Sequence, residues 1–343
     1  MDVRAALKEG MARLREARVP SHTLAAELLL MHVLDCERAW LYTHPEHLMD
    51  AAAVERYFEL VARRNAGVPT QYLTGRQEFW GLEFEVTPDV LIPRPETEHV
   101  IEVALERIGQ ETLGGSPGAR GRVLGHHRPP GQALRIADVG TGSGCLAVAL
   151  AHELPEAQVF GTDASAAALA VAWRNAARHG VETRVHFLGC NLLDALECGT
   201  LLVPKEVEGL PPSEGGGALR PCSGQEPLHS PEPRATGHES RFFHLIVSNP
   251  PYVGRREAGE LPREVREHEP GEALFAGEQG FDLYAPLIRQ AEKLLVRGGH
   301  LVVELSHTAL EVVRPLVGPV AWTNVDVTND LAGIPRVLAA ERR

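Results

Sequence analysis

The stretch LRIADVGTGSGCLAVAL, residues 134–150, decides the fold. An apolar run that predicts a buried strand leads into closely spaced glycines, and an apolar helix pattern follows them. Glycines permit a tight turn and let a ligand approach the main chain, while the free N–H groups at a helix start can bind it. The next strand-like run ends at Asp163, about 20 residues after the glycines, where a carboxylate can accept hydrogen bonds from a ribose diol. The stretch therefore predicts the nucleotide-binding part of an α/β fold.

The position of the third glycine indicates which nucleotide binds. A dinucleotide fingerprint would place it at 145, but Cys145 stands there and the glycine is at 144. The resulting D-x-G-x-G-x-G pattern resembles the S-adenosylmethionine loop of class I methyltransferases, in which the acid can face the methionine ammonium group. The alternative is a glycine-rich turn that binds nothing. The cofactor-binding residues expected here are Asp138, Gly140, Thr141, Gly142, Ser143, Gly144 and Asp163.

Strand and helix patterns alternate on both sides of this loop and predict a doubly wound, mostly parallel sheet. Helices are expected over 282–299 and 308–318, and the C-terminal segments 321–330 and 335–343 are expected to close the sheet as a strand pair. Two other segments break the alternation, because 110–133 and 198–241 are rich in Pro and Gly. We interpret them as a flexible linker and a flexible insertion without a catalytic role.

Residues 2–66 predict a small helical bundle. Ser21 is expected to cap its second helix, and the third is expected over 51–67. The bundle could serve packing or dimerisation, or it could recognise a substrate. A hairpin is predicted around Gly81, and Thr97 is a candidate N-cap for the helix that follows the prolines of residues 92–98.

A second motif, Asn249-Pro250-Pro251-Tyr252, follows the apolar strand of residues 243–248 and so should open onto the same crevice as the glycines. An amide or aromatic amine nitrogen is a poor nucleophile because its lone pair is delocalised. Acceptors must hold its N–H groups so that the lone pair can point at the methyl group. The Asn249 side chain and the Pro250 carbonyl can supply two acceptors, and the prolines restrict the loop. Tyr252 offers a ring face to a planar group. The alternative is a proline turn that ends a strand.

The tetrad, the glycine loop and the segment IPRPETE of residues 92–98 together resemble the HemK/PrmC family of N5-glutamine methyltransferases, which modify the GGQ glutamine of peptide chain release factors. The resemblance implies three parts: a release-factor-recognition domain over 1–74, a hairpin linker over 75–96 and a methyltransferase domain over 97–343. It implies that S-adenosyl-L-methionine is the cofactor. Asn249, Pro250 and Tyr252 would be catalytic, and with Pro251 they would hold the substrate glutamine, while Asn249 would also lie against the cofactor.

Further residues near the expected cleft are also candidates. Where the family has an acid near adenine, this chain has Asn191 and Leu192, and the Asn191 carbonyl can still accept from an adenine amine. Arg94 and Glu96 could line the cleft and bind substrate, or they could tie the hairpin to the catalytic domain. Glu304 ends a strand on the cleft side, where a functional and a structural role are both open.

Composition sets further bounds. The net charge of −12 argues against direct nucleic-acid binding. Five cysteines without a C-x-x-C pair exclude a disulfide scaffold and give no zinc site, and the histidines give no metal pattern. No signal peptide or membrane-spanning run is present. We therefore expect a soluble cytoplasmic monomer without a metal or a membrane partner.

The expected reaction is direct methyl transfer from sulfonium to a glutamine amide nitrogen. Three alternatives remain: a ribosomal protein glutamine N5-methyltransferase, an N6-adenine nucleic-acid methyltransferase, which shares the Asn-Pro-Pro-Tyr tetrad, and a non-catalytic binding module of the same fold. Cofactor affinity separates the last from the others, and the modified product separates the enzymes.

Overall fold

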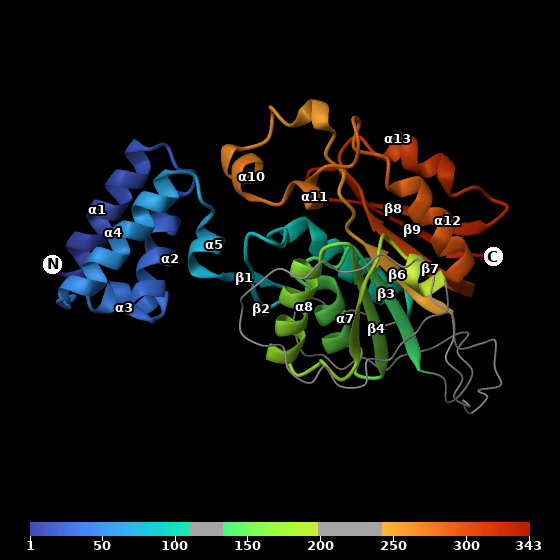
Figure 1. The fold of residues 1–343 in the computed structure, drawn as a ribbon, viewed down its shortest axis with the longest axis horizontal. Helices are drawn as coiled ribbons and strands as arrows, with labels where there is room; N and C mark the ends of the chain where they lie inside the picture. The colour runs from blue at the N-terminus through green and yellow to red at the C-terminus, as the bar shows by residue number, and fades with distance from the viewer. Residues whose placement is uncertain (110–132, 198–241) are drawn as a thin grey trace, which may run out of the picture.

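The computed structural model describes residues 1–109, 133–197 and 242–343. The insertion at 198–241 and all but the last residue of the linker at 110–133 lie outside the described residues, so their interpretation stays a prediction. Figure 1 shows the N-terminal helices gathered at one end of the molecule and a helix-covered sheet at the other.

The sheet confirms the predicted α/β class. Its order is β5-β4-β3-β6-β7-β9-β8, and neighbours from β5 to β7 are parallel while β9 runs antiparallel to β7 and β8. The strand order reverses beside β3, so the ligand crevice of such a fold lies at the carboxyl ends of β3 and its neighbours. The strands are β3 (Leu134–Val139), β4 (Ala157–Asp163), β5 (Val185–Gly189), β6 (Phe243–Ser248), β7 (Leu295–Glu304), β8 (Trp322–Asn329) and β9 (Pro335–Arg342).

Helices cover both faces of this sheet (Figure 1) and bury one hydrophobic cluster on each. One cluster includes Ile101 and Leu146, and the other includes Tyr284 and Trp322. The helices are α6 (Glu98–Arg107), α7 (Cys145–Glu153), α8 (Ala166–Arg178), α9 (Asp194–Glu197), α10 (Arg263–His268), α11 (Gly271–Leu274), α12 (Tyr284–Leu294) and α13 (Leu310–Val313), with 3-10 turns η1 (Pro95–Thr97), η3 (Arg255–Glu257) and η4 (Arg314–Leu316).

Two expected helices are shorter than the sequence pattern suggested. The helix expected over 282–299 ends at Leu294, because Leu295 already pairs with Phe243 in the sheet. The helix expected over 308–318 is a single turn, α13, followed by η4. Pro315 lies in η4, and proline lacks the N–H that would continue an α-helix.

The N-terminal bundle consists of α1 (Val3–Glu16), α2 (His22–Leu34), α3 (Arg38–Thr43), α4 (Ala51–Asn65) and α5 (Thr70–Thr74) around its own core. The three longer helices were predicted, whereas α3 and α5 are too short for periodicity to indicate them. The prediction that Ser21 caps α2 is wrong, because its backbone is left-handed and its side chain makes no cap bond. Asp2 and Asp50 cap α1 and α4 instead.

The hairpin around Gly81 is confirmed, with β1 (Arg76–Phe79) paired antiparallel to β2 (Leu82–Glu85). Trp80 and Gly81 both have positive φ, as a two-residue hairpin turn of type I′ requires. The Trp80 ring nitrogen donates to Glu153 of α7, which attaches the hairpin to a helix that covers the large sheet. A second contact between the N-terminal bundle and the rest of the chain is the ion pair between Arg64 of α4 and Glu264 of α10.

No helix of the described residues is long and apolar enough to cross a membrane.

Candidate active site

The glycine loop joins β3 to α7 at the carboxyl edge of the sheet. Gly140, Gly142 and Gly144 all have positive φ, which glycine adopts without strain. A Cβ at Gly140 or Gly142 would meet no atom within 4 Å, whereas one at Gly144 would lie 3.1 Å from the Ala172 Cβ. The first two glycines thus leave open space above the loop, and the third lets α7 pack against α8.

Asp138 lies at the base of this loop and is fully buried. Its Oδ2 accepts from the Thr141 hydroxyl at 2.6 Å and from the Ala147 amide at 3.1 Å, while its Oδ1 has no hydrogen-bond partner. Burial raises the pKa of Asp138 to about 7, against the smaller lowering effect of these two bonds. A buried carboxylate oxygen without a donor fits the ammonium group predicted for it.

Asp163 ends β4, as predicted for the residue that binds the ribose. Its Oδ2 accepts from the Gly142 amide and its Oδ1 from the Ser165 amide, each at 2.9 Å. These two bonds fix the carboxylate beside the glycine loop. Each oxygen keeps a further lone pair for a ribose hydroxyl, so the residue fits that role.

The expected adenine edge follows β5. Asn191 is exposed, and Leu192 packs against the core cluster that contains Tyr284. The Cys190 amide donates to the Asp163 carbonyl at 3.0 Å, which brings this turn next to the end of β4. The structure therefore places Asn191 and Leu192 next to the other predicted cofactor residues.

The Asn249–Tyr252 tetrad leaves the sheet at the end of β6, directly beside the glycine loop. Ser248 pairs with Val139 across the β3–β6 ladder, and its hydroxyl donates to the Val139 carbonyl at 2.7 Å. The two predicted motifs therefore start from adjacent strand ends. Pro250 is buried and Pro251 is partly exposed.

Asn249 has one satisfied end and one free end. Its Nδ2 donates to the Thr97 hydroxyl at 3.0 Å, while its buried Oδ1 has no partner. The prediction that Thr97 caps α6 is wrong. Its backbone is helical and its side chain makes no cap bond, because the hydroxyl is engaged by Asn249 instead.

Tyr252 and Glu304 meet on the other side of the tetrad. The Tyr252 hydroxyl donates to Glu304 Oε1 at 3.3 Å, and Glu304 is only 2% exposed at the end of β7. Burial raises the pKa of Glu304 to about 7, while the nearby Thr97 and Tyr252 side chains lower it by less. Burial also raises the pKa of Tyr252, so its hydroxyl stays protonated at neutral pH.

Arg94 forms an ion pair with Glu269 at 2.6 Å, and the Glu269 side chain is almost completely buried. Glu269 belongs to the segment that follows the tetrad, so this pair ties the proline segment to it, which was one of the two roles considered for Arg94. Glu96 is exposed and close enough to Glu304 to raise its pKa. Arg94 acts on Tyr252 of the tetrad, whose pKa its charge lowers, so both predicted residues lie near the tetrad.

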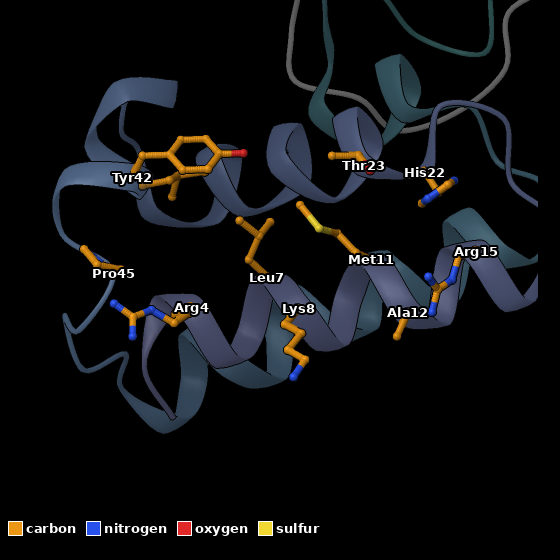
Figure 2. Close-up of a pocket in the computed structure, with 11 residues that line it drawn as sticks. Arg4, Leu7, Lys8, Met11, Ala12, Arg15, His22, Thr23, Tyr42 and Pro45 are labelled. Atoms are coloured by element: carbon orange, nitrogen blue, oxygen red, sulfur yellow. The ribbon is translucent and has the colours of Figure 1, made fainter.

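A groove of about 610 Å³ lies on the N-terminal bundle, away from the tetrad. Figure 2 shows Leu7 and Met11 pointing from α1 toward the side that carries Tyr42. Its rim carries Arg4, Lys8 and Arg15, and none of its lining residues is acidic. Among the described residues no cluster of His, Cys, Asp and Glu could hold a metal ion.

Sequence patterns left the network behind the tetrad undetected. Thr97 looked like a helix cap, and Glu304 was equally consistent with a structural role. The signal that could have been used is topological, since Ser248 pairs with Val303 and so places Glu304 level with Asn249 at the sheet edge.

Comparison with known proteins supports the interpretation of the N-terminal helical bundle and of the domain that contains the large sheet. Residues 5–75 match the PrmC N-terminal domain, and residues 131–201 match a methyltransferase domain. The chain is 38% identical to a release factor glutamine methyltransferase of Koribacter versatilis (strain Ellin345), over 100% of this chain and 99% of that one. It is 36% identical to a release factor glutamine methyltransferase of Moorella thermoacetica, again over 100% and 99%.

Among solved structures, the hMettl16 catalytic domain in complex with MAT2A 3'UTR hairpin 6 aligns over 82% of both chains, at 14% identity and a TM-score of 0.48. That likeness is too distant to support any argument about this chain. The full-length relatives, by contrast, confirm the predictions of a methyltransferase and of S-adenosylmethionine as its methyl donor. The chain belongs to the release factor glutamine methyltransferase family.

Proposed function

We propose that this protein transfers a methyl group from S-adenosyl-L-methionine to the side-chain nitrogen of the GGQ glutamine in peptide chain release factors. One observation carries the proposal: Asn249 presents a buried Oδ1 without a partner beside the glycine loop, while its Nδ2 is held by Thr97. An acceptor in that state suits a substrate amide N–H. The names of the relatives support a release-factor glutamine as the substrate.

One set of residues would bind the methyl donor, and another set would bind the substrate amide. Asp163 would bind the ribose, Asp138 the ammonium group, the loop from Gly140 to Gly144 the chain between them, and Asn191 and Leu192 the adenine. S-adenosylmethionine supplies an electrophilic methyl group on its sulfonium.

On the substrate side, Asn249 Oδ1 and the Pro250 carbonyl would accept the two amide N–H bonds, so that the nitrogen lone pair can point at the methyl group. The Tyr252 ring would lie against the planar amide, with Pro251 restricting the loop. The nitrogen would form a bond to the methyl carbon while the sulfur–carbon bond breaks and its electron pair stays on the departing thioether sulfur, and the nitrogen would then lose a proton to water.

The N-terminal domain, residues 1–74, would recognise the release factor, with 75–96 as the hairpin linker and 97–343 as the methyltransferase domain. The basic rim and apolar floor of the groove on α1 support this role, because they suit an acidic segment that carries an apolar side chain. The protein would work as a monomer in the cytoplasm.

Mass spectrometry tests the function directly. The protein is incubated with S-adenosylmethionine and a purified release factor, and the digest is searched for one added methyl group on the GGQ glutamine. The same protein is also incubated with DNA and with ribosomal proteins. Methylation of adenine, or of a ribosomal protein glutamine in preference to the release factor, would contradict the proposal.

A further inference from the structure

The side chain of Tyr252 is held at its hydroxyl end by one residue of the large sheet. The hydroxyl donates to Glu304 Oε1 at 3.3 Å, and Glu304 is its one hydrogen-bond partner among the described residues. Glu304 is the last residue of β7 and is only 2% exposed, whereas Tyr252 is partly exposed. The tetrad is thus joined to the buried end of a neighbouring strand through the Tyr252 ring.

Glu304 is itself fixed by the sheet. It pairs with Val337 in the β7–β9 ladder, and the Tyr284 hydroxyl donates to its main-chain carbonyl at 3.1 Å. Its strand, β7, lies between β6 and β9, so its main chain is bound on both sides. The other carboxyl oxygen, Oε2, is buried and has no partner. The carboxyl group therefore offers the Tyr252 hydroxyl an acceptor in a fixed place.

The main chain of Tyr252 is fixed separately, by the close approach of Gly280. A Cβ on Gly280 would lie 2.3 Å from the Tyr252 carbonyl oxygen and 2.8 Å from the Gly254 nitrogen, which is too close for any side chain. Gly280 also has a positive φ of 85°, which glycine adopts without strain. With its main chain held, Tyr252 can still rotate about its side-chain bonds, and the hydroxyl bond then selects the direction of the ring.

This bond forms in either protonation state of Glu304. Burial raises the pKa of Glu304 to about 7, so both states are present at neutral pH. An ionised carboxylate accepts through both oxygens, and a protonated carboxyl group keeps an oxygen that accepts. Burial also raises the pKa of Tyr252, so its hydroxyl retains the proton that it donates.

We propose that Glu304 is a positioning residue that holds the ring of Tyr252 in place against the amide of the substrate glutamine. The inference rests on the proposed function, in which this ring lies against the planar amide. Glu304 acts through the Tyr252 hydroxyl and not on the reacting atoms. Because hydroxyl donors usually lie about 2.7–2.8 Å from their acceptors, a bond of 3.3 Å adds little stability, and its loss should appear in the rate.

The test removes the bond from each side. Tyr252→Phe keeps the ring without the hydroxyl, Glu304→Leu removes the acceptor, and Glu304→Gln keeps one. Single-turnover methyl transfer to the release factor should fall about tenfold to a hundredfold in Tyr252→Phe and in Glu304→Leu, since displacing a positioned group by about 1 Å can cost about a hundredfold. Glu304→Gln should retain most of the rate, because either end of its amide can bond to a hydroxyl. S-adenosylmethionine affinity and melting temperature should stay near the wild-type values.

A double-mutant cycle shows whether Glu304 acts through Tyr252. In a Tyr252→Phe background, Glu304→Leu should cost little further rate, because the bond is already absent. Tyr252→Phe leaves the buried carboxyl group in place, so it tests the bond even if Glu304→Leu fails to fold. Equal losses in both backgrounds, or a wild-type rate in Tyr252→Phe, would overturn the inference alone. A wild-type protein that methylates no release-factor glutamine would overturn the proposed function and the inference together.

Discussion

At the residue scale, the site depends on carboxyl groups that burial keeps close to neutrality. Asp138 and Glu304 are both fully enclosed, and burial raises the pKa of each to about 7. Their surroundings then assign different roles to them. Each has one buried oxygen without a donor, but the other Asp138 oxygen is bonded within the glycine loop, whereas the other Glu304 oxygen accepts from the Tyr252 hydroxyl behind the tetrad. We expect the charge of Asp138 to change when the cofactor binds, and we expect Glu304 to support the residues that bind the substrate.

Cofactor binding should release protons through Asp138. An ammonium group beside the carboxylate favours its ionised form and so lowers a pKa that stands at about 7 in the free protein. At pH 6.5 the free carboxyl is largely protonated, so binding should expel a substantial fraction of one proton, and affinity should rise between pH 6 and 7. Calorimetry in buffers of different ionisation enthalpy measures this release.

The matched variant for that experiment is Asp138→Asn, which can still accept from Thr141 and Ala147 but does not titrate. It should bind S-adenosylmethionine more weakly and without the proton release. Equal release in the wild type and in the variant would show that Asp138 does not meet the ammonium group.

At the element scale, a single side chain of α8 connects the hairpin to the glycine loop. Asn175 is fully buried, and it accepts from the Glu85 amide at 2.7 Å while donating to the Glu85 carbonyl at 3.0 Å and to the Ser143 carbonyl at 2.8 Å. The strand β2 and the cofactor loop thus share one anchor.

Replacing this anchor should affect both stability and cofactor binding. Asn175→Ala removes the partner of three main-chain groups, of which the two on Glu85 are partly exposed and can bind water. The free energy of unfolding should fall by about 2–4 kcal/mol, since each fully unsatisfied buried group costs about 1–3 kcal/mol. The substitution should also weaken S-adenosylmethionine binding, because Ser143 loses its support. Denaturant unfolding and calorimetry measure the two effects. Trp173→Ala, an exposed neighbour on the same helix, serves as the control, and an equal loss there would argue against the anchor.

Most of the elements could be predicted because their signals are local. The glycine loop, the strand end at Asp163 and the tetrad are contiguous patterns, and the structure brings them to adjacent strand ends. The partners of these motifs could not be predicted in the same way. Thr97 and Asn249 are 152 positions apart in the chain, and Arg94 and Glu269 are 175 positions apart. Only the folded chain brings each pair into contact. Short elements such as α3 also escape prediction, because one or two helical turns carry no periodicity.

At the scale of the whole molecule, charge is unevenly distributed. The chain carries a net charge of −12, yet the groove on the N-terminal bundle has a rim of bases and no acidic lining residue. The bundle also contacts the segment after the tetrad through the Arg64–Glu264 ion pair. A partner bound at the groove would therefore be held by a domain that is attached to the site.

Reversing charge at the groove should weaken binding of the release factor without changing the chemistry. Lys8→Glu with Arg15→Glu should raise KM for the release factor about threefold to tenfold, with single-turnover rate at saturation and S-adenosylmethionine affinity unchanged. Arg289→Glu with Arg297→Glu makes the same change in net charge at exposed positions outside the groove and should leave KM near the wild-type value. Equal effects of the two pairs would point to net charge rather than to the groove.

The most direct test of the account is single-turnover methyl transfer to the GGQ glutamine of a purified release factor by the wild type and by Asn249→Ala, with calorimetry of S-adenosylmethionine on both proteins. The account predicts that the variant loses about a hundredfold or more in rate, as when one preorganised polar contact to a reacting group is removed, and that its cofactor affinity stays nearly unchanged. Asn249→Asp keeps the shape but adds charge beside the sulfonium, and it should be slowed rather than inactive. Transfer by Asn249→Ala at the wild-type rate would contradict the central claim, because the tetrad would then be only a turn at the end of β6.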